Sequence, residues 1–152
     1  MDITKQVLSI EQMQHLNKLG LELGETMCYW ARLIDYNPKS QEHYGKWILV
    51  IGNNQQHVGL TGWEFVPAYT LQDILEKLPE SIKDDENEMF RSTVYWYYLT
   101  ISPSWTVSYE EGKNFLEPIK FFASESLLKS AYEMLCWCIE KGFIKTGKEE
   151  TK

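Results

Sequence analysis

The sequence lacks the features that would place the protein in a membrane or on nucleic acid. Its 152 residues include no apolar run of about 18 residues, the length needed to cross a bilayer. Lysine and arginine total 15 against 22 acidic residues, and a formal net charge of -7 is unsuited to neutralising a phosphate backbone. The N-terminal segment carries no signal-peptide pattern. We therefore expect an acidic, cytoplasmic protein that binds neither membranes nor nucleic acid.

Cysteine and histidine are scarce. The three cysteines are Cys28, Cys136 and Cys138, an odd number without the spacing of a disulfide framework. Cys136 and Cys138 would point in nearly opposite directions on a helix, and the three histidines are isolated in the sequence. The sequence therefore predicts reduced thiols, no metal site and no cofactor. A buried, apolar environment for Cys28 is favoured over a nucleophilic role, because no local motif supplies a base.

Motifs of nucleotide binding and catalysis are also missing. Gly52, Gly59 and Gly62 have neither the spacing nor the lysine of a phosphate-binding loop. The acids of residues 84–88 are contiguous and lack the glycine of an EF-hand, which favours a solvated loop over a calcium site. We assign no catalytic residue, and a non-enzymatic role is the favoured interpretation.

Aromatic residues, by contrast, are abundant at 14% of the chain, with 6 tryptophans and 9 tyrosines. The chain length predicts a single domain over residues 1–146, followed by a frayed polar tail over residues 147–152. Helical and strand patterns alternate along it. We expect a two-layer α+β domain, in which an antiparallel, meander-rich sheet carries the N- and C-terminal helices on one face.

The clearest helical pattern runs from Ser124, the expected N-cap, to Gly142, whose left-handed conformation would let Phe143 fold back on Cys138 in a Schellman closure. Trp137 is the exception, because it projects from the polar side of this helix. One interpretation is that residues after Gly142 fold over it. The other is that Trp137 anchors a homodimer or a protein partner, since tryptophan often dominates interface energy.

Two further helices have capping boxes at their starts, one from Ser9 to Gln12 and one from Thr70 to Asp73. Strands are expected at residues 27–35 and 63–66. The continuous apolar run 47–51 predicts a central strand covered on both faces, with a hairpin leading from Gly52 to residue 60.

Residues 93–102 form the strongest strand pattern, and residues 105–109 its expected hairpin partner. Strand alternation places Val94, Trp96 and Tyr98 on one face and Tyr95, Tyr97 and Leu99 on the other. One of these faces, together with Trp105 and Tyr109 across the hairpin, would form an exposed aromatic platform if the helices cover the opposite face. Ordinary packing of these rings in the core is the simpler alternative.

Three blocks of the chain carry a resemblance: residues 67–79 (PAYTLQDILEKLP), residues 131–144 (AYEMLCWCIEKGFI), and the helix of residues 13–20 followed by Met27-Cys28-Tyr29-Trp30. With these blocks the chain resembles small proteins of unassigned activity that are encoded in phages and mobile elements of gut anaerobic bacteria. This resemblance covers about half of the chain. It implies a bacterial, cytoplasmic protein of mobile-element origin, and it brings no catalytic residue with it.

Two functions are compatible with these patterns. The first is a non-enzymatic protein-interaction module that binds a partner or itself through Trp137, Trp96, Tyr98, Trp105 and Tyr109. The alternative is a small-molecule binder or enzyme with an aromatic-lined pocket between sheet and helix. Imitation of DNA by the acidic surface is less favoured, because the charge is modest and its acids form no long runs.

Overall fold

The computed structural model describes residues 2–34, 45–52, 62–84, 94–113 and 116–147. The chain divides into two compact units, Met1–Asp73 and Ile74–Lys152, and each is described by itself. The single domain expected over residues 1–146 stays a prediction. Within the described parts of the chain, no helix is both long enough and apolar enough to cross a membrane.

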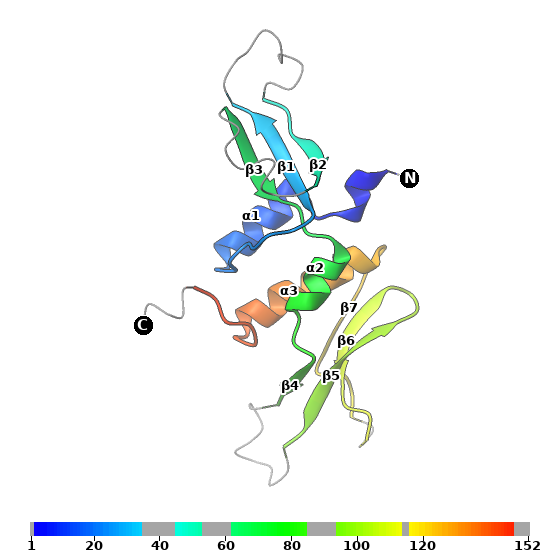
Figure 1. The fold of residues 1–152 in the computed structure, drawn as a ribbon. Coiled ribbons are helices and arrows are strands. Elements are labelled where there is room, and N and C mark those ends of the chain that lie inside the picture. The colour runs from blue at the N-terminus through cyan, green and yellow to red at the C-terminus, as the bar shows by residue number, and fades with distance from the viewer. Residues whose placement is uncertain (1, 35–44, 53–61, 85–93, 114–115, 148–152) are drawn as a thin grey trace. The chain divides into compact units, whose positions relative to one another are not determined.

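The first unit contains a small antiparallel sheet, two short helical segments and the first turn of another helix. The described residues form a three-stranded sheet with the order β2-β1-β3 (Figure 1). The elements are η1 (Ile3–Gln6), α1 (Ile10–Lys18), β1 (Cys28–Leu33), β2 (Ile48–Ile51) and β3 (Trp63–Pro67). β1 is central because it pairs with β2 on one side and with β3 on the other.

Strand β2 corrects an expectation. The apolar run 47–51 predicted a central strand covered on both faces, but among the described strands β2 lies at the edge of its sheet, and Ile51 is 51% exposed. Strand order depends on long-range pairing, and an apolar run of four residues cannot by itself distinguish a central strand from an edge strand. The predicted hairpin from Gly52 to residue 60 lies largely outside the described residues.

Both capping boxes are confirmed. In α1 the Gln12 N–H donates to Ser9 Oγ at 3.2 Å, and the Ser9 N–H donates to Gln12 Oε1 at 2.9 Å. In α2 (Leu71–Lys77) the Thr70 N–H donates to Asp73 Oδ2 at 2.8 Å, and the Asp73 N–H donates back to Thr70 Oγ1 at 3.3 Å. These reciprocal bonds satisfy backbone donors that a helix start would otherwise leave unpaired.

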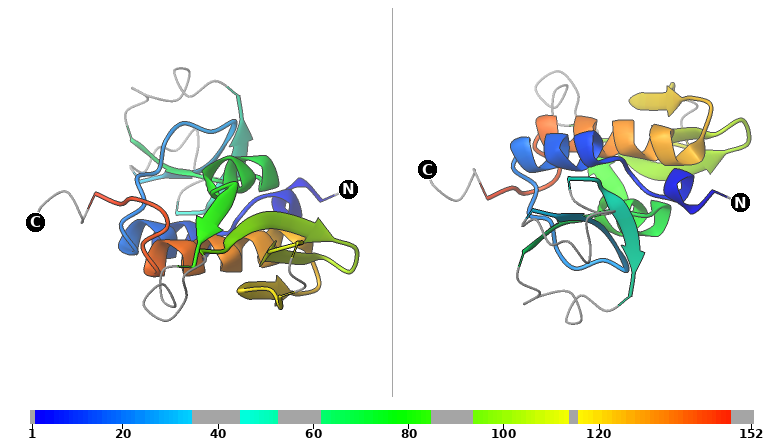
Figure 2. Two further views of the ribbon diagram at one scale, coloured as in Figure 1. Left: turned by 90° about the horizontal axis from the view of Figure 1, so that it is seen from below. Right: turned by 90° about the horizontal axis from the view of Figure 1, so that it is seen from above.

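The second unit carries a larger sheet with a long helix against it. Its described residues form a four-stranded antiparallel sheet in the order β4-β5-β6-β7. The elements are β4 (Ser81–Lys83), β5 (Trp96–Ser102), β6 (Thr106–Glu110), β7 (Lys120–Ala123) and α3 (Leu127–Glu140). α3 packs against β6 and β7, as the turned views also show (Figure 2). Its buried residues include Ala131, Met134, Leu135, Cys138 and Ile139.

The ends of α3 bear out one prediction and correct another. The N-cap is Ser126 rather than Ser124, because the Ser126 side chain accepts the hydrogen bond from the Lys129 N–H at 3.1 Å. At the other end Gly142 has φ 79°, and the Phe143 N–H donates to the Cys138 carbonyl at 2.9 Å. The Schellman closure predicted for this end is therefore confirmed.

The fold class is α+β with antiparallel sheets, as predicted, and the strands belong to two sheets. α1 lies against β3 in the first unit, and α3 lies against β6 and β7 in the second. Most of the acidic stretch 84–88, which was predicted to be a solvated loop, lies outside the described residues.

Candidate functional site

Trp137 occupies the last turns of α3, on the side away from the buried stripe of that helix. Its side chain is half-buried. The Schellman closure turns the chain so that Phe143 comes back beside it, and the two rings lie with centroids 5.4 Å apart at an interplanar angle of 42°. A residue directly after Gly142 thus packs on this indole, which was one of the two interpretations drawn from the sequence.

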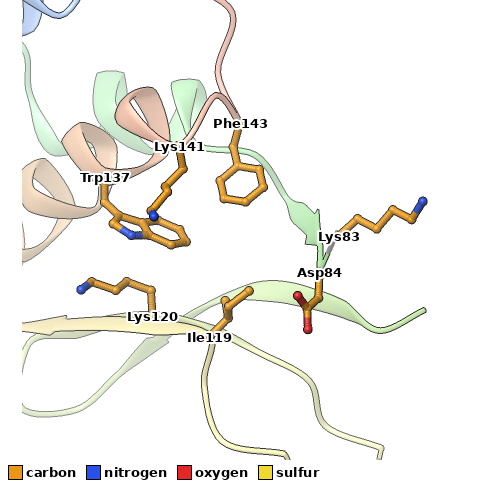
Figure 3. A pocket seen from close by; sticks show the side chains of 7 residues that line it. All are labelled: Lys83, Asp84, Ile119, Lys120, Trp137, Lys141 and Phe143. Carbon is orange, nitrogen blue, oxygen red and sulfur yellow. The ribbon is translucent and has the colours of Figure 1, made fainter. Parts of the chain in front are cut away.

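A pocket of about 360 Å³ lies beside Trp137, within the second unit. Its lining residues come from the end of β4, the start of β7, α3 and the segment after it: Lys83, Asp84, Ile119, Lys120, Trp137, Lys141 and Phe143. Figure 3 shows Trp137 and Lys141 extending from α3 towards the sheet, with Ile119 and Lys120 facing them and Lys83 extending away. The pocket therefore combines an apolar wall of two rings and an isoleucine with ammonium groups.

The described residues that line this pocket carry mostly positive charge. Three of them are lysines and one is an aspartate. The Lys120 Nζ lies 5.1 Å from the ring centroid of Phe122, a cation–π contact that holds this ammonium group beside the pocket. Asp84 is only 7% exposed, and its N–H donates to the Tyr95 carbonyl at 3.1 Å.

A second candidate surface is the face of the four-stranded sheet that exposes Trp96 and Tyr98. These side chains are 48% and 58% exposed, and Phe121 on β7 is 60% exposed. The register places Tyr98 opposite Glu110 and Phe121 opposite Ser108, so all of these residues share one face. We call Trp96, Tyr98 and Phe121 the aromatic face.

Tyr109 does not belong to this exposed surface, contrary to the sequence-based platform. It is fully buried, on the opposite face of β6, and its hydroxyl donates to the Pro79 carbonyl at 2.7 Å. Burial raises the pKa of this hydroxyl, and the neighbouring Cys138 raises it further. Strand alternation alone does not show which of the two alternating sets of side chains in residues 105–109 faces the core.

Trp105 stands at the tip of the β5–β6 hairpin and is 54% exposed. Ser104 and Trp105 have φ angles of 67° and 58°, a left-handed conformation that is uncommon for a bulky residue. The buried Ser130 hydroxyl of α3 donates to the Trp105 carbonyl at 2.6 Å. This bond ties the hairpin tip to the helix and helps to hold the unfavourable turn.

The structure thus distributes the residues singled out in the sequence. Trp96 and Tyr98 share the aromatic face, Trp105 is at the hairpin tip, Trp137 lines the pocket, and Tyr109 is core. Sequence reasoning missed Phe121 and the two lysines Lys120 and Lys141. The signal for Phe121 was the pair Phe121-Phe122, since adjacent strand residues point to opposite faces and one of two aromatics had to face outward.

The thiols are not suited to nucleophilic chemistry. Burial raises the pKa of Cys28, raises that of Cys136 to about 11 and raises that of Cys138 to about 12, so all three stay protonated near neutral pH. Cys28 is 6% exposed, in the buried environment expected for it. Among the described residues, no group of three or more histidine, cysteine or acidic side chains is arranged to hold a metal ion.

Comparison with protein-family models, with curated proteins and with solved structures finds no match to this chain. The pocket and the aromatic face are therefore the structural features that bear on function.

Proposed function

We propose that this chain is a non-enzymatic binding protein of a phage or mobile element, acting in the cytoplasm, and that it holds a small molecule in the pocket beside Trp137. The observation that carries this proposal is the half-buried indole of Trp137, which lines a pocket of about 360 Å³. Ligand pockets typically have volumes of about 300–1,000 Å³ and mostly apolar walls with few polar groups. The mobile-element origin is supported by the resemblance at residues 67–79 and 131–144.

The geometry around Trp137 explains why a ligand ring would bind there. Phe143 fixes one side of the indole at 5.4 Å between centroids, which leaves the rest of the ring system towards Ile119 and Lys120. Offset stacking or edge-to-face contact with an aromatic ligand is worth about 0.5–1.5 kcal/mol beyond the area that it buries. An aromatic ligand would therefore replace water against an already positioned apolar wall.

Indole N–H signals in a ¹⁵N spectrum test this proposal. The chain has 6 tryptophans, and Trp137→Phe assigns the signal of interest by its loss. Titration with indole, benzoate, phenol and adenine should shift the Trp137 signal with at least one compound and leave the Trp105 signal in place. Trp105→Phe is the matched control, because Trp105 belongs to the same unit but lies at the tip of the β5–β6 hairpin and is not one of the residues that line the pocket. If no compound moves the Trp137 signal, the proposed function is wrong.

The aromatic face favours a second candidate function, self-association of the chain. Lys83 is the register partner of Trp96, and Glu110 is the register partner of Tyr98, so the face carries both signs of charge beside its rings. Two copies related by a two-fold axis would bring each lysine near the other copy's glutamate and bury the exposed rings. The face is thus self-complementary in charge.

Light scattering at a low and a high protein concentration tests self-association. A dimer should form at the high concentration, Phe121→Glu should abolish it, and Trp137→Ala should leave it intact because Trp137 is not part of the aromatic face. A monomer at both concentrations would remove this candidate.

A further inference from the structure

We infer that the pocket beside Trp137 selects ligands that join an aromatic ring to an anionic group, either a carboxylate or a phosphate. This inference rests on the proposed function, since it presumes that the pocket binds a small molecule, and it names the chemical class of that molecule. The juxtaposition of an indole with Lys120 and Lys141 in one pocket carries it.

The described lining of the pocket is opposite in charge to the protein. The whole chain has a formal net charge of -7, whereas the described lining residues include three lysines and one aspartate. Lys83 extends away from the indole, so Lys120 and Lys141 are the two ammonium groups nearest to a bound ligand (Figure 3). Within the described residues, neither Lys120 nor Lys141 forms an ion pair with a carboxylate. Their charge is available to a ligand.

The acceptors that would favour a cationic ligand are already used or covered. At the end of α3, three backbone carbonyls already accept hydrogen bonds from the residues that follow the helix. The N–H of residue 141 donates to the Trp137 carbonyl, that of residue 142 to the Ile139 carbonyl, and that of residue 143 to the Cys138 carbonyl. Among the described lining residues Asp84 is the one carboxylate, and it is 7% exposed. The pocket therefore offers donors at its mouth and an apolar wall inside, which is the pattern for an anion attached to a ring.

Carboxylate and phosphate are both suitable partners for these lysines. An ammonium group acts as a point charge with rotatable donors and lacks the planar fork by which arginine selects a bidentate acceptor. The described residues that line the pocket include no arginine. The recognised chemistry is thus a negative charge at the edge of an aromatic ring, and the experiment separates its two sources.

Matched ligands that differ only in charge test the inference. The dissociation constants of indole-3-acetate, indole-3-acetamide and tryptamine are measured from the shift of the Trp137 indole signal, and phenyl phosphate is titrated alongside. The acetate should bind about three- to tenfold more tightly than the neutral amide, because two partly exposed ion pairs are gained, and the advantage should shrink in high salt. Tryptamine should bind more weakly than the amide. The affinity of phenyl phosphate relative to that of benzoate, which carries the same ring, then identifies which anion the pocket favours.

Charge-removing variants locate the effect. Lys120→Gln combined with Lys141→Gln should bring the affinity for indole-3-acetate down to that for the amide and leave the affinity for the amide nearly unchanged. Lys129→Gln is the control, since Lys129 lies on the same helix but pairs with Glu125 at 3.2 Å. Equal binding of acetate and amide, or loss of acetate affinity in the control alone, overturns the inference and leaves the proposed function standing. If no ligand shifts the Trp137 signal, both the proposed function and this inference are wrong.

Discussion

The two units use their aromatic residues differently. In the first unit the polar tips of Trp30 and Tyr69 are tied to the unit's own backbone: the Trp30 indole N–H donates to the Leu8 carbonyl at 2.9 Å, and the Tyr69 hydroxyl accepts from the Gly24 N–H at 3.2 Å. Such rings are structural because moving them would leave backbone groups unpaired.

The second unit keeps Tyr109 in that role and leaves other rings accessible. Tyr109 is fully buried and bonded to the backbone, but Trp96, Tyr98 and Phe121 are about half exposed and Trp137 lines the pocket. The aromatic surplus of the sequence therefore has two causes. One part stabilises the fold, and the other part is concentrated where the second unit can bind something.

The largest expected effect on stability distinguishes the structural rings of the second unit from its accessible rings. Tyr109→Ala should lower the free energy of unfolding by about 3–5 kcal/mol, because it opens a cavity under α3 and removes the bond to the Pro79 carbonyl. Tyr98→Ala should change it by about 0.5 kcal/mol or less, because the ring is 58% exposed. Urea unfolding followed by circular dichroism measures both. Similar losses for the two variants would erase the distinction between structural and accessible rings.

Alkaline pH should weaken the protein through its buried thiols and hydroxyls. Burial raises the pKa of Cys138 to about 12 and that of Cys136 to about 11, and it also raises the pKa of Tyr109. A group with a raised pKa keeps its full stabilising contribution below its unfolded value and loses it as pH rises towards its folded value. Each fully buried group therefore lowers stability by up to about 1.4 kcal/mol per pH unit within that window.

The urea midpoint measured between pH 7 and pH 11 checks this window. It should be flat up to about pH 8.5, the ordinary pKa of a thiol, and then fall. Cys138→Ala should fall less steeply than the unaltered protein, and Cys28→Ala makes the matching comparison for the first unit, where burial also raises the pKa of the thiol. A urea midpoint that stays constant to pH 11 would contradict the claim that burial raises the pKa of these thiols.

Local features of the fold were predictable from the sequence. Both capping boxes and the Schellman closure depend on residues only a few positions apart, so the residue types Ser9, Thr70 and Gly142 were sufficient to predict them. The N-cap of α3 was missed by two residues because Ser124 and Ser126 are both suitable. Their roles differ in the fold: Ser126 caps the helix, and Ser124 Oγ lies 3.0 Å from the buried Ser130 Oγ.

Long-range pairing accounts for what the sequence did not show. The edge position of β2 depends on which strands pair with β1, and the burial of Tyr109 depends on which face α3 covers. For Trp137, the helical angle correctly placed the indole off the core side. It gave no indication that Ile119 and Lys120, at the start of β7, would come to the same pocket, so the charge of the site was not foreseen.

A smaller effect is expected where α3 holds the β5–β6 hairpin. Ser130→Ala removes the donor to the Trp105 carbonyl at 2.6 Å and should cost about 1–2 kcal/mol. Ser104→Ala is the control, because the Ser104 hydroxyl is exposed. Serine and alanine also have the same conformational cost at the φ of 67° that this position adopts. Thermal unfolding compares the two. A cost for the control equal to that for Ser130→Ala would show that the bond to Trp105 contributes nothing.

The smallest effect belongs to the first unit and concerns its charged sheet residues. Arg32 on β1 pairs with Glu64 on β3 in register, and its guanidinium lies 4.5 Å from the ring centroid of Trp47. Glu64→Gln should cost less than about 1 kcal/mol, because both side chains are more than a third exposed and solvent screens the pair. Arg32→Gln should cost more, since it also removes the cation over Trp47.

Urea unfolding at low and high salt separates the contributions: salt should reduce the cost of Glu64→Gln and leave part of the cost of Arg32→Gln. If the two variants lose equal stability at both salt concentrations, the contact between Arg32 and Trp47 contributes nothing to the free energy of unfolding. Trp47 would then be a ring of the first unit that no stabilising contact of this kind holds in place.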